Sequence, residues 1–545
     1  MKSLSRILIV IFFLLTSVSV YSQTHDQQID DIVISDFSPV LSFLSSDWME
    51  GREAGARGSF MAADYIASMM EHNGLKPYGD PLPVKESVSG KENNPARCYF
   101  QDFDIIKYKI DKASLSWINQ TGASAISFQL NHSIDFEVEA GPNGLEGEAP
   151  LVFAGYGISA PDKGYDDYKN LDVKGKIVVV LKGYPGHHDT ASMAWKKLGK
   201  AFGKEYSSVE IKRKYALNRG AIAFIEVSPD GSFNPYKNSQ SNLSIAQSDM
   251  NSEKQTDPVY RDDFYALPGD TSNITIPLFR LGSMATEKLF VGTGLNVKNV
   301  EDKAAKNLLT SSTAIKEKIP GFSLAVKAEA LKVRNVLGII PGKDTTKSVI
   351  VGAHYDHLGS RNALIYNGAD DNATGVAGML SIAKVWSMFS QKPACNIIFA
   401  AWTAEEKGLL GSSYFVQYTK ADTNILRLIV NLDMISRSSA EDSAHLQLSI
   451  GTLRGNEAFK TIAQNNNLLL SHPFELDLWE ASASGGSDYA PFASRNIPVM
   501  TFFSGFHNDY HSPRDTYDRT DLSKMKSVLW LVNKCLKDVV KSIPD

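Results

Sequence analysis

The second half of the chain alternates short apolar runs with helix-like segments, and this pattern restricts the possible folds most strongly. Residues 349–352, 396–401, 426–432 and 499–503 have the length and composition of buried strands, and residues 374–389 have helical spacing. Strands that alternate with helices form a largely parallel sheet covered on both faces. We therefore predict an α/β/α sandwich around a mixed, largely parallel sheet.

The first half of the chain has a different texture, which indicates a second folded region. Residues 36–80 are helical in pattern, whereas residues 140–310 contain apolar strand-like runs between turns rich in Gly and Asp. A chain of 545 residues has room for more than one domain. We predict one α/β domain formed by residues 30–135 and 320–545, interrupted by a β-rich insert at residues 140–310.

The N-terminus has the pattern of a secretory signal peptide. Lys2 and Arg6 precede an unbroken apolar run at residues 7–15, and small residues precede a plausible cleavage site before Gln23. This run is shorter than the roughly 20 residues that a transmembrane helix needs. We expect residues 1–22 to be removed and the mature protein to be secreted or periplasmic, without stable insertion in a membrane.

The composition excludes several classes of protein. The chain has 56 Lys and Arg against 61 Asp and Glu, and a net charge of −5, so it lacks the basic surplus of a nucleic-acid binder. Its three cysteines are too few for a disulfide framework.

Side chains that commonly bind metals follow the predicted strands. His354 ends the first strand, the Glu405–Glu406 pair follows the second, Asp433 follows the third and His511 comes after the fourth. Ligand sites form at the carboxyl ends of strands in such sheets. Asp371 adds a further carboxylate from the loop between the first strand and the helix at residues 374–389. The whole set contains imidazole and carboxylate donors, a mixture that suits two zinc ions.

Each of these residues alone has a simpler explanation. A single His at a strand end is usually structural, a Glu pair is usually a solvated corner, and residues 370–372 could cap a helix. Their joint order favours a site instead. One Glu of the pair can bind metal while its neighbour takes a proton from a water that the ions activate.

These motifs resemble those of the co-catalytic dizinc aminopeptidases, a family whose relatives include the glutamate carboxypeptidases. The resemblance lies in residues 351–356, 368–375, 405–406, 431–434 and 509–511, with further likeness at 50–55, 62–66, 335–342, 487–492 and 497–499. It implies two Zn²⁺ per chain. The implied metal ligands are His354, Asp371, Glu406, Asp433 and His511, with Asp371 as the bridge between the ions.

The resemblance also implies three catalytic roles. Glu405 would be the general base. Asp356 would hydrogen-bond the His354 imidazole and fix its tautomer. Tyr510 would donate to the developing oxyanion. His357 could be a reserve ligand, but it is expected to pack or to bond nearby backbone. His507 is four residues before His511, a spacing that could pair on a helix, but the intervening Asn and Asp suggest a loop, so His511 alone is favoured.

The insert resembles a protease-associated domain at residues 151–157, 166–168, 171–181 and 214–227. Such a domain would restrict access or hold substrate, or act as a spacer. Together these resemblances imply a secreted metallo-aminopeptidase that removes the N-terminal residue of peptides.

Two alternatives remain open from the sequence. One is a carboxypeptidase or dipeptidase of the same family acting on acidic peptides, for which Arg495 and Arg514 could bind the substrate carboxylate. The other is a catalytically silent, receptor-like relative that has lost its metals.

Overall fold

The computed structural model describes residues 37–82, 96–121, 124–139, 141–199, 202, 206–228, 233, 263–270, 275–316, 318–420 and 424–542. The predicted signal peptide lies outside them. The chain divides into two compact units: the first contains the chain up to Ile105 and from Leu331 onward, and the second contains most of the chain between. Residues 106–135 and 320–330, which we expected in the first domain, fall in the second unit.

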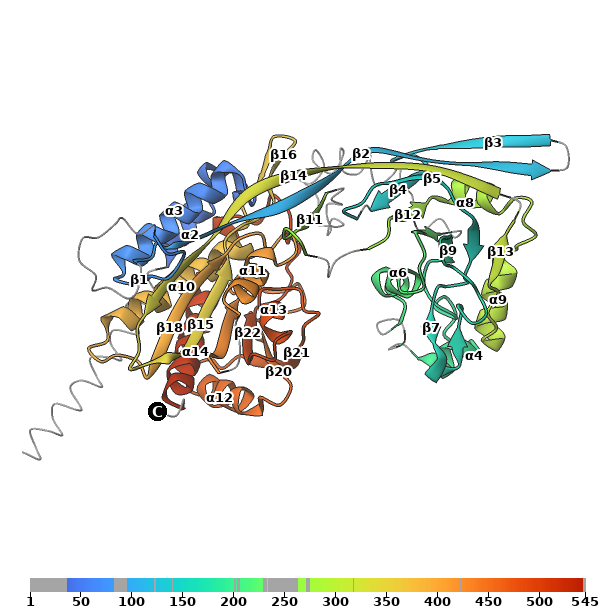
Figure 1. The fold of residues 1–545 in the computed structure, drawn as a ribbon. Helices are drawn as coiled ribbons and strands as arrows, with labels where there is room; N and C mark the ends of the chain where they lie inside the picture. Colours follow the sequence, from blue (N-terminus) through green and yellow to red (C-terminus); the bar gives the residue numbers. More distant parts are fainter. Residues whose placement is uncertain are drawn as a thin grey trace, which may run out of the picture. The chain divides into compact units, whose positions relative to one another are not determined.

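The first unit is built on a mixed sheet (Figure 1). Its strands follow the order β14-β18-β15-β19-β22-β20-β21, with β1 (Lys76–Pro77) paired to β14 (Lys318–Ile340). The strands are β15 (Asp344–His354), β18 (Cys395–Trp402), β19 (Leu426–Leu432), β20 (Gln447–Leu453), β21 (Glu475–Ala481) and β22 (Val499–Phe503). The pairs β18–β15, β15–β19 and β19–β22 are parallel, so these strands end at one edge of the sheet.

Helices cover both faces of this sheet. On β15, Val349 and Val351 pack into one apolar core with helices α2, α3, α10, α12 and α14, whereas Ile350 packs into another core with α11 and α13. These helices are α2 (Ser38–Leu44), α3 (Arg57–His72), α10 (Gly375–Met388), α11 (Leu410–Tyr418), α12 (Glu457–Asn467), α13 (Ala490–Ala493) and α14 (Leu522–Ser542).

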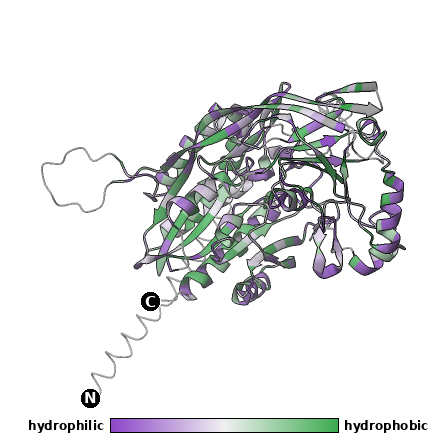
Figure 2. Cartoon of the chain, turned by 45° about the vertical axis from the view of Figure 1, so that its right-hand side comes forward, coloured by the Kyte–Doolittle hydropathy of each residue, from purple (hydrophilic) through white to green (hydrophobic). Residues whose placement is uncertain are grey.

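Burial on both faces explains why the strands read as continuous apolar runs rather than as alternating ones. Figure 2 shows these central strands as hydrophobic ribbons. The predicted α/β fold with a large mixed sheet is confirmed. Short elements complete the first unit: η1 (Asp47–Arg52), β16 (Gly359–Arg361), β17 (Leu364–Tyr366), η3 (Ala369–Thr374) and η4 (Tyr517–Arg519).

The second unit has its own sheet, in the order β13-β6-β9-β10-β12-β4, and its own apolar core. Strands β6, β9, β10 and β12 are parallel and β13 and β4 are antiparallel edges. Their bounds are β4 (Phe136–Glu139), β6 (Leu151–Phe153), β9 (Ile177–Leu181), β10 (Ala223–Val227), β12 (Leu278–Leu281) and β13 (Thr313–Ile315). Helices accompany them: α4 (Met193–Leu198), α6 (Val209–Leu217), α8 (Ser283–Phe290) and α9 (Val297–Asn307). This unit is therefore less purely β than we expected.

Two long strands, β2 (Phe100–Thr121) and β14, contribute residues to both units. The remaining elements of the second unit are β3 (Ser124–Asn131), β5 (Leu145–Glu148), β7 (Ser159–Ala160), η2 (Pro161–Lys163), β8 (Tyr165–Asp166) and β11 (Phe264–Ala266). Among the helices that the structure describes, none is both long and apolar enough to cross a bilayer.

Helix α14 is joined to the loop before β20 by a buried ion pair. The Lys524 ammonium donates to the Asp442 carboxylate at 3.1 Å, and only 1% and 3% of the two side chains are exposed. The same carboxylate accepts the backbone N–H groups of Leu446 and Gln447 and the Ser438 hydroxyl. Burial alone would raise the pKa of Asp442, but these donors lower it to about 2.

We predict that Asp442→Asn lowers the free energy of unfolding by about 2 kcal/mol at pH 7. Because the folded-state pKa is depressed, the stabilisation is present above the unfolded pKa near 4 and is lost as the pH falls through 2. Denaturant unfolding of both proteins at several pH values measures the difference. A difference in unfolding free energy between the two proteins that stayed constant from pH 7 to below pH 2 would show that it does not come from the Asp442 carboxylate charge.

Candidate metal centre

The parallel strands bring the predicted site residues to one edge of the sheet. His354 is the last residue of β15, the Glu405–Glu406 pair begins three residues after β18, and Asp433 follows β19 directly. His511 lies in the loop that follows β22. The common strand direction therefore explains why residues far apart in sequence meet here.

Asp371 comes from the turn η3 in front of helix α10. The turn starts after Gly368, which has a φ of +55°. A Cβ at this position would lie 2.1 Å from the Asp371 carbonyl oxygen and 2.5 Å from ring carbons of His357. Glycine therefore permits both the left-handed backbone and the close approach of these two residues.

The two carboxylate oxygens of Asp371 face two different histidines. Its Oδ1 lies 3.3 Å from His354 Nε2, and its Oδ2 lies 3.1 Å from His511 Nε2. This is the arrangement that a carboxylate bridging two ions requires.

Each of the two histidines also meets a second carboxylate. Asp433 Oδ1 lies 3.4 Å from His354 Nε2, and Glu406 Oε1 lies 3.3 Å from His511 Nε2. Donors held 2.0–2.2 Å from a tetrahedral zinc ion lie roughly 3.3–3.6 Å apart. The spacing of this donor set therefore fits two adjacent zinc positions.

Mutual charge in this cluster shifts the pKa values strongly. Burial alone would lower the pKa of His354, but Glu405 and Asp433 raise it well above its usual value. Burial likewise opposes the charge on His511, but Glu406 and Asp371 raise its pKa to about 10. The carboxylates favour the protonated, cationic forms of His354 and His511, because positive charge offsets the repulsion among the carboxylates. Metal ions at the same place would supply that positive charge instead.

Glu405 lies beside the donor set. Its Oε2 is 4.0 Å from His354 Nε2, and its side chain is 11% exposed. Burial raises its pKa well above the usual value. A carboxylate with a raised pKa accepts protons readily, which is the property required of a general base.

Asp356 acts through both its backbone and its side chain. The His354 Nδ1–H group donates to the Asp356 carbonyl oxygen at 3.1 Å, whereas the carboxylate Oδ1 is 4.0 Å away. The expected hydrogen bond to the imidazole thus comes from the main chain. The carboxylate instead accepts the backbone N–H of Glu405 at 3.1 Å, and so positions the neighbouring Glu pair.

Asp433 and Tyr510 are also held by neighbours. The Ser487 hydroxyl donates to Asp433 Oδ2 at 2.5 Å. The Tyr510 ring stacks on His511 with 3.8 Å between ring centroids, and burial raises the pKa of the phenol. Ser487, which sequence reasoning placed only within a motif, orients this carboxylate.

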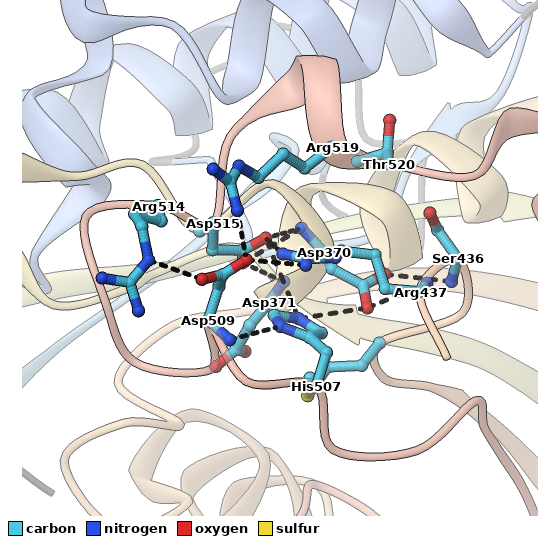
Figure 3. Close-up of polar contacts among 12 residues, drawn as sticks. Asp370, Asp371, Ser436, Arg437, His507, Asp509, Arg514, Asp515, Arg519 and Thr520 are labelled. Carbon is cyan, nitrogen blue, oxygen red and sulfur yellow. Dashed lines mark hydrogen bonds and ion pairs between the residues drawn. The ribbon is translucent and has the colours of Figure 1, made fainter. Parts of the chain in front are cut away.

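A buried network supports the Asp371 turn from behind (Figure 3). The Asp515 carboxylate accepts the backbone N–H groups of Asp370, at 3.0 and 3.1 Å, and of Asp371, at 3.0 Å. The Asp370 carboxylate in turn accepts the backbone N–H groups of Ser436 and Arg437. This network couples the bridging residue to the loop after Asp433.

Arginines neutralise the network. Asp509 accepts hydrogen bonds from Arg437, Arg514 and Arg519, which together lower its pKa to about 2 against the opposing effect of burial. Arg514 is thus engaged with Asp509, a role that the sequence did not indicate.

The structure brings together all eight residues singled out in the sequence as ligands or catalytic groups. It also adds His357, whose Nδ1 lies 2.8 Å from Glu406 Oε1. His357 is fully buried, so it packs as expected, and its ring faces this carboxylate rather than nearby backbone. The sequence signal was available, since His357 is only three residues beyond His354.

Comparison with known proteins identifies the domain that carries this centre. Residues 335–536 match Peptidase family M28. This stretch belongs to that family of peptidases. The chain is 31% identical over 182 residues to the "probable leucine aminopeptidase 2" of Aspergillus oryzae, in a match that covers 33% of this chain and 35% of the relative. It is 28% identical over 218 residues to "Aminopeptidase YwaD" of Bacillus subtilis, covering 38% and 45%.

The fold of the whole chain is shared with a solved structure. The "Aminopeptidase from Aneurinibacillus sp. strain AM-1" matches with a TM-score of 0.56 and 19% identity over 94% of this chain and 96% of the other. By sequence, the chain spans only about a third to a half of the two curated relatives.

We predict that Asp515→Asn weakens zinc binding by about 10–100-fold, the range typical of groups that orient a metal ligand. The amide keeps one acceptor oxygen where the carboxylate offers two to the N–H groups of Asp370 and Asp371. Competition with a coloured chelator measures the affinity. Asp518→Asn, on the exposed side of the same segment, is the matched control, and equal affinity in both variants would contradict the role.

Proposed function

We propose that this protein is a metallo-aminopeptidase that removes the N-terminal residue of peptides, with two zinc ions per chain and Glu405 as general base. The observation that supports it most directly is the paired donor set around Asp371, with an unligated glutamate beside it. The names of the relatives point in the same direction. An intact donor set also disfavours a catalytically silent, receptor-like role.

A cavity of about 240 Å³ adjoins the metal centre. Besides the ligands, its lining is mainly apolar and aromatic, with Met434, Trp479, Tyr489, Phe503 and Phe506. Such a lining fits an apolar side chain of the residue to be removed.

The same lining favours an aminopeptidase over a carboxypeptidase. Recognition of a substrate carboxylate commonly uses arginine, yet the described residues around the cavity include neither Arg nor Lys. Arg514 donates to Asp509 at 2.6 Å, and Arg495 is exposed after α13. The carboxylates of Glu405 and Asp433, by contrast, suit a cationic α-amine.

The chain's own residues divide the chemistry between them. His354, Asp371, Asp433, Glu406 and His511 would hold the ions, which supply Lewis acidity and lower the pKa of water. Glu405 takes a proton from the attacking water and delivers it to the leaving amine nitrogen. Because burial keeps the Tyr510 phenol protonated, its O–H can donate to the carbonyl oxygen as negative charge develops there.

Two assignments outside the metal centre belong to the same proposal. The mature enzyme would be exported after loss of residues 1–22, and the second unit would be a protease-associated insert. The basic and apolar pattern of the N-terminus and the motifs at residues 151–181 support them.

We predict stepwise trimming of peptides with free N-termini, fastest where the first residue is large and apolar, and none of N-acetylated peptides. Purified protein with zinc would be mixed with a library containing both kinds, and products followed by mass spectrometry with a chelated control. Loss of residues from C-termini would instead indicate a carboxypeptidase. No cleavage by zinc-loaded protein would count against the proposal.

We further predict that Glu405→Gln lowers kcat by at least about 100-fold while zinc content stays unchanged, because the amide cannot accept the water proton. Glu406→Gln is the matched comparison and should lose zinc. Elemental analysis beside steady-state kinetics separates the two effects. Near-normal turnover of Glu405→Gln would refute its role as base.

A further inference from the structure

His357 stands next to one of the two metal positions. We propose that it is a direct ligand there, through Nδ1, together with Asp371, Glu406 and His511. This inference rests on the proposed function, because it concerns the same metal centre.

The donor spacing supports ligation. His357 Nδ1 lies 2.8 Å from Glu406 Oε1 and 3.6 Å from Asp371 Oδ2. The His511 Nε2 atom lies 3.3 and 3.1 Å from the same two oxygens. Both imidazoles thus face the same pair of carboxylate oxygens. Three of the four distances are near the roughly 3.3–3.6 Å that separates donors around a tetrahedral ion, and the distance from His357 to Glu406 is shorter.

The environment of the ring also favours ligation. His357 is completely buried, yet neither ring nitrogen has a hydrogen-bond partner. A buried polar group without a partner costs roughly 1–3 kcal/mol. Nδ1 lies 2.8 Å from the Glu406 carboxylate, and a metal ion shared with that carboxylate would satisfy the buried nitrogen.

The backbone holds His357 in this place. Its N–H donates to the Arg52 carbonyl oxygen at 3.2 Å. The Arg52 guanidinium is itself fully buried and donates to the carbonyl oxygens of Tyr355, two residues before His357, and of Gly368, which lies against the His357 ring. Gly368 leaves the space that the ring occupies. The ring is therefore preorganised rather than free to turn away.

This ligand would make the two metal positions unequal. One position has four protein donors, from His357, Asp371, Glu406 and His511. The other has three, from His354, Asp371 and Asp433. Four protein ligands are typical of closed zinc sites, whereas three leave a place for water or substrate. The substrate would therefore engage the His354 position, and the His357 position would exchange its metal more slowly.

Metal competition on the intact protein tests this assignment. Zinc titrations against a chelator would compare wild type, His357→Ala and His357→Asn, with His445→Ala as a control at an exposed histidine. The Asn side chain can donate a hydrogen bond to Glu406, as the imidazole would if it were not a ligand, but Asn is a poor zinc ligand. Thermal unfolding without metal would show whether each variant folds.

We expect wild type to bind two ions, and both His357 variants to bind one of them at least about 100-fold more weakly, beyond the 10–100-fold typical of groups that merely orient a ligand. Unchanged affinity in His357→Ala, or full recovery in His357→Asn, would overturn the assignment.

The wild-type protein offers a test that needs no variant. In a crystal structure with zinc, Nδ1 should lie about 2.0–2.1 Å from one ion. An Nδ1 beyond bonding distance from both ions would overturn the ligand assignment alone. Wild type that binds no zinc would overturn the proposed function as well, so the two failures are distinguishable.

Discussion

Repulsion among buried carboxylates is the constraint on which the rest of the catalytic unit depends. Asp371, Glu405, Glu406 and Asp433 converge at one edge of the sheet, where little water can screen them. Burial of unpaired charge is costly unless cations or hydrogen bonds compensate it. The raised pKa values of His354 and His511 express this requirement, because protonation brings in positive charge. Two divalent ions at the same place would satisfy it more fully.

The chain supports this unfavourable cluster mainly through its backbone. Asp515 binds the N–H groups of the Asp371 turn, and Asp356 binds that of Glu405. Arg52 ties the loop after β15 to the segment before η3 through carbonyl oxygens. Each contact fixes a stretch of main chain rather than a single side chain, so the donors keep their spacing before any ion binds. Such preorganisation limits the reorganisation that metal binding requires.

The sequence predicted the sheet and the main donors because both follow from local patterns. Apolar runs of strand length identified β15, β18, β19 and β22, and the residues after them identified the site. Asp515 was assigned no role, and His357 was considered only as a reserve ligand, because their positions depend on how separate loops approach each other. No periodicity encodes the contact between residues 52 and 357, or the space that Gly368 leaves. The boundary between the units was equally hard to place, since β2 and β14 continue through it.

The two sides of the centre differ in chemistry, and this difference would account for the proposed removal of a single residue. Behind Asp371 and His511 lies a rigid polar network of Asp515, Asp509 and arginines, which leaves the metal ligands little freedom. In front lies a small cavity walled by Trp479, Tyr489 and Phe506. Apolar walls favour the side chain of one terminal residue, and the nearby carboxylates favour its charged amine. When the apolar walls hold the first side chain of a peptide and the carboxylates hold its amine, the bond that lies at the metal centre is the first peptide bond of that substrate.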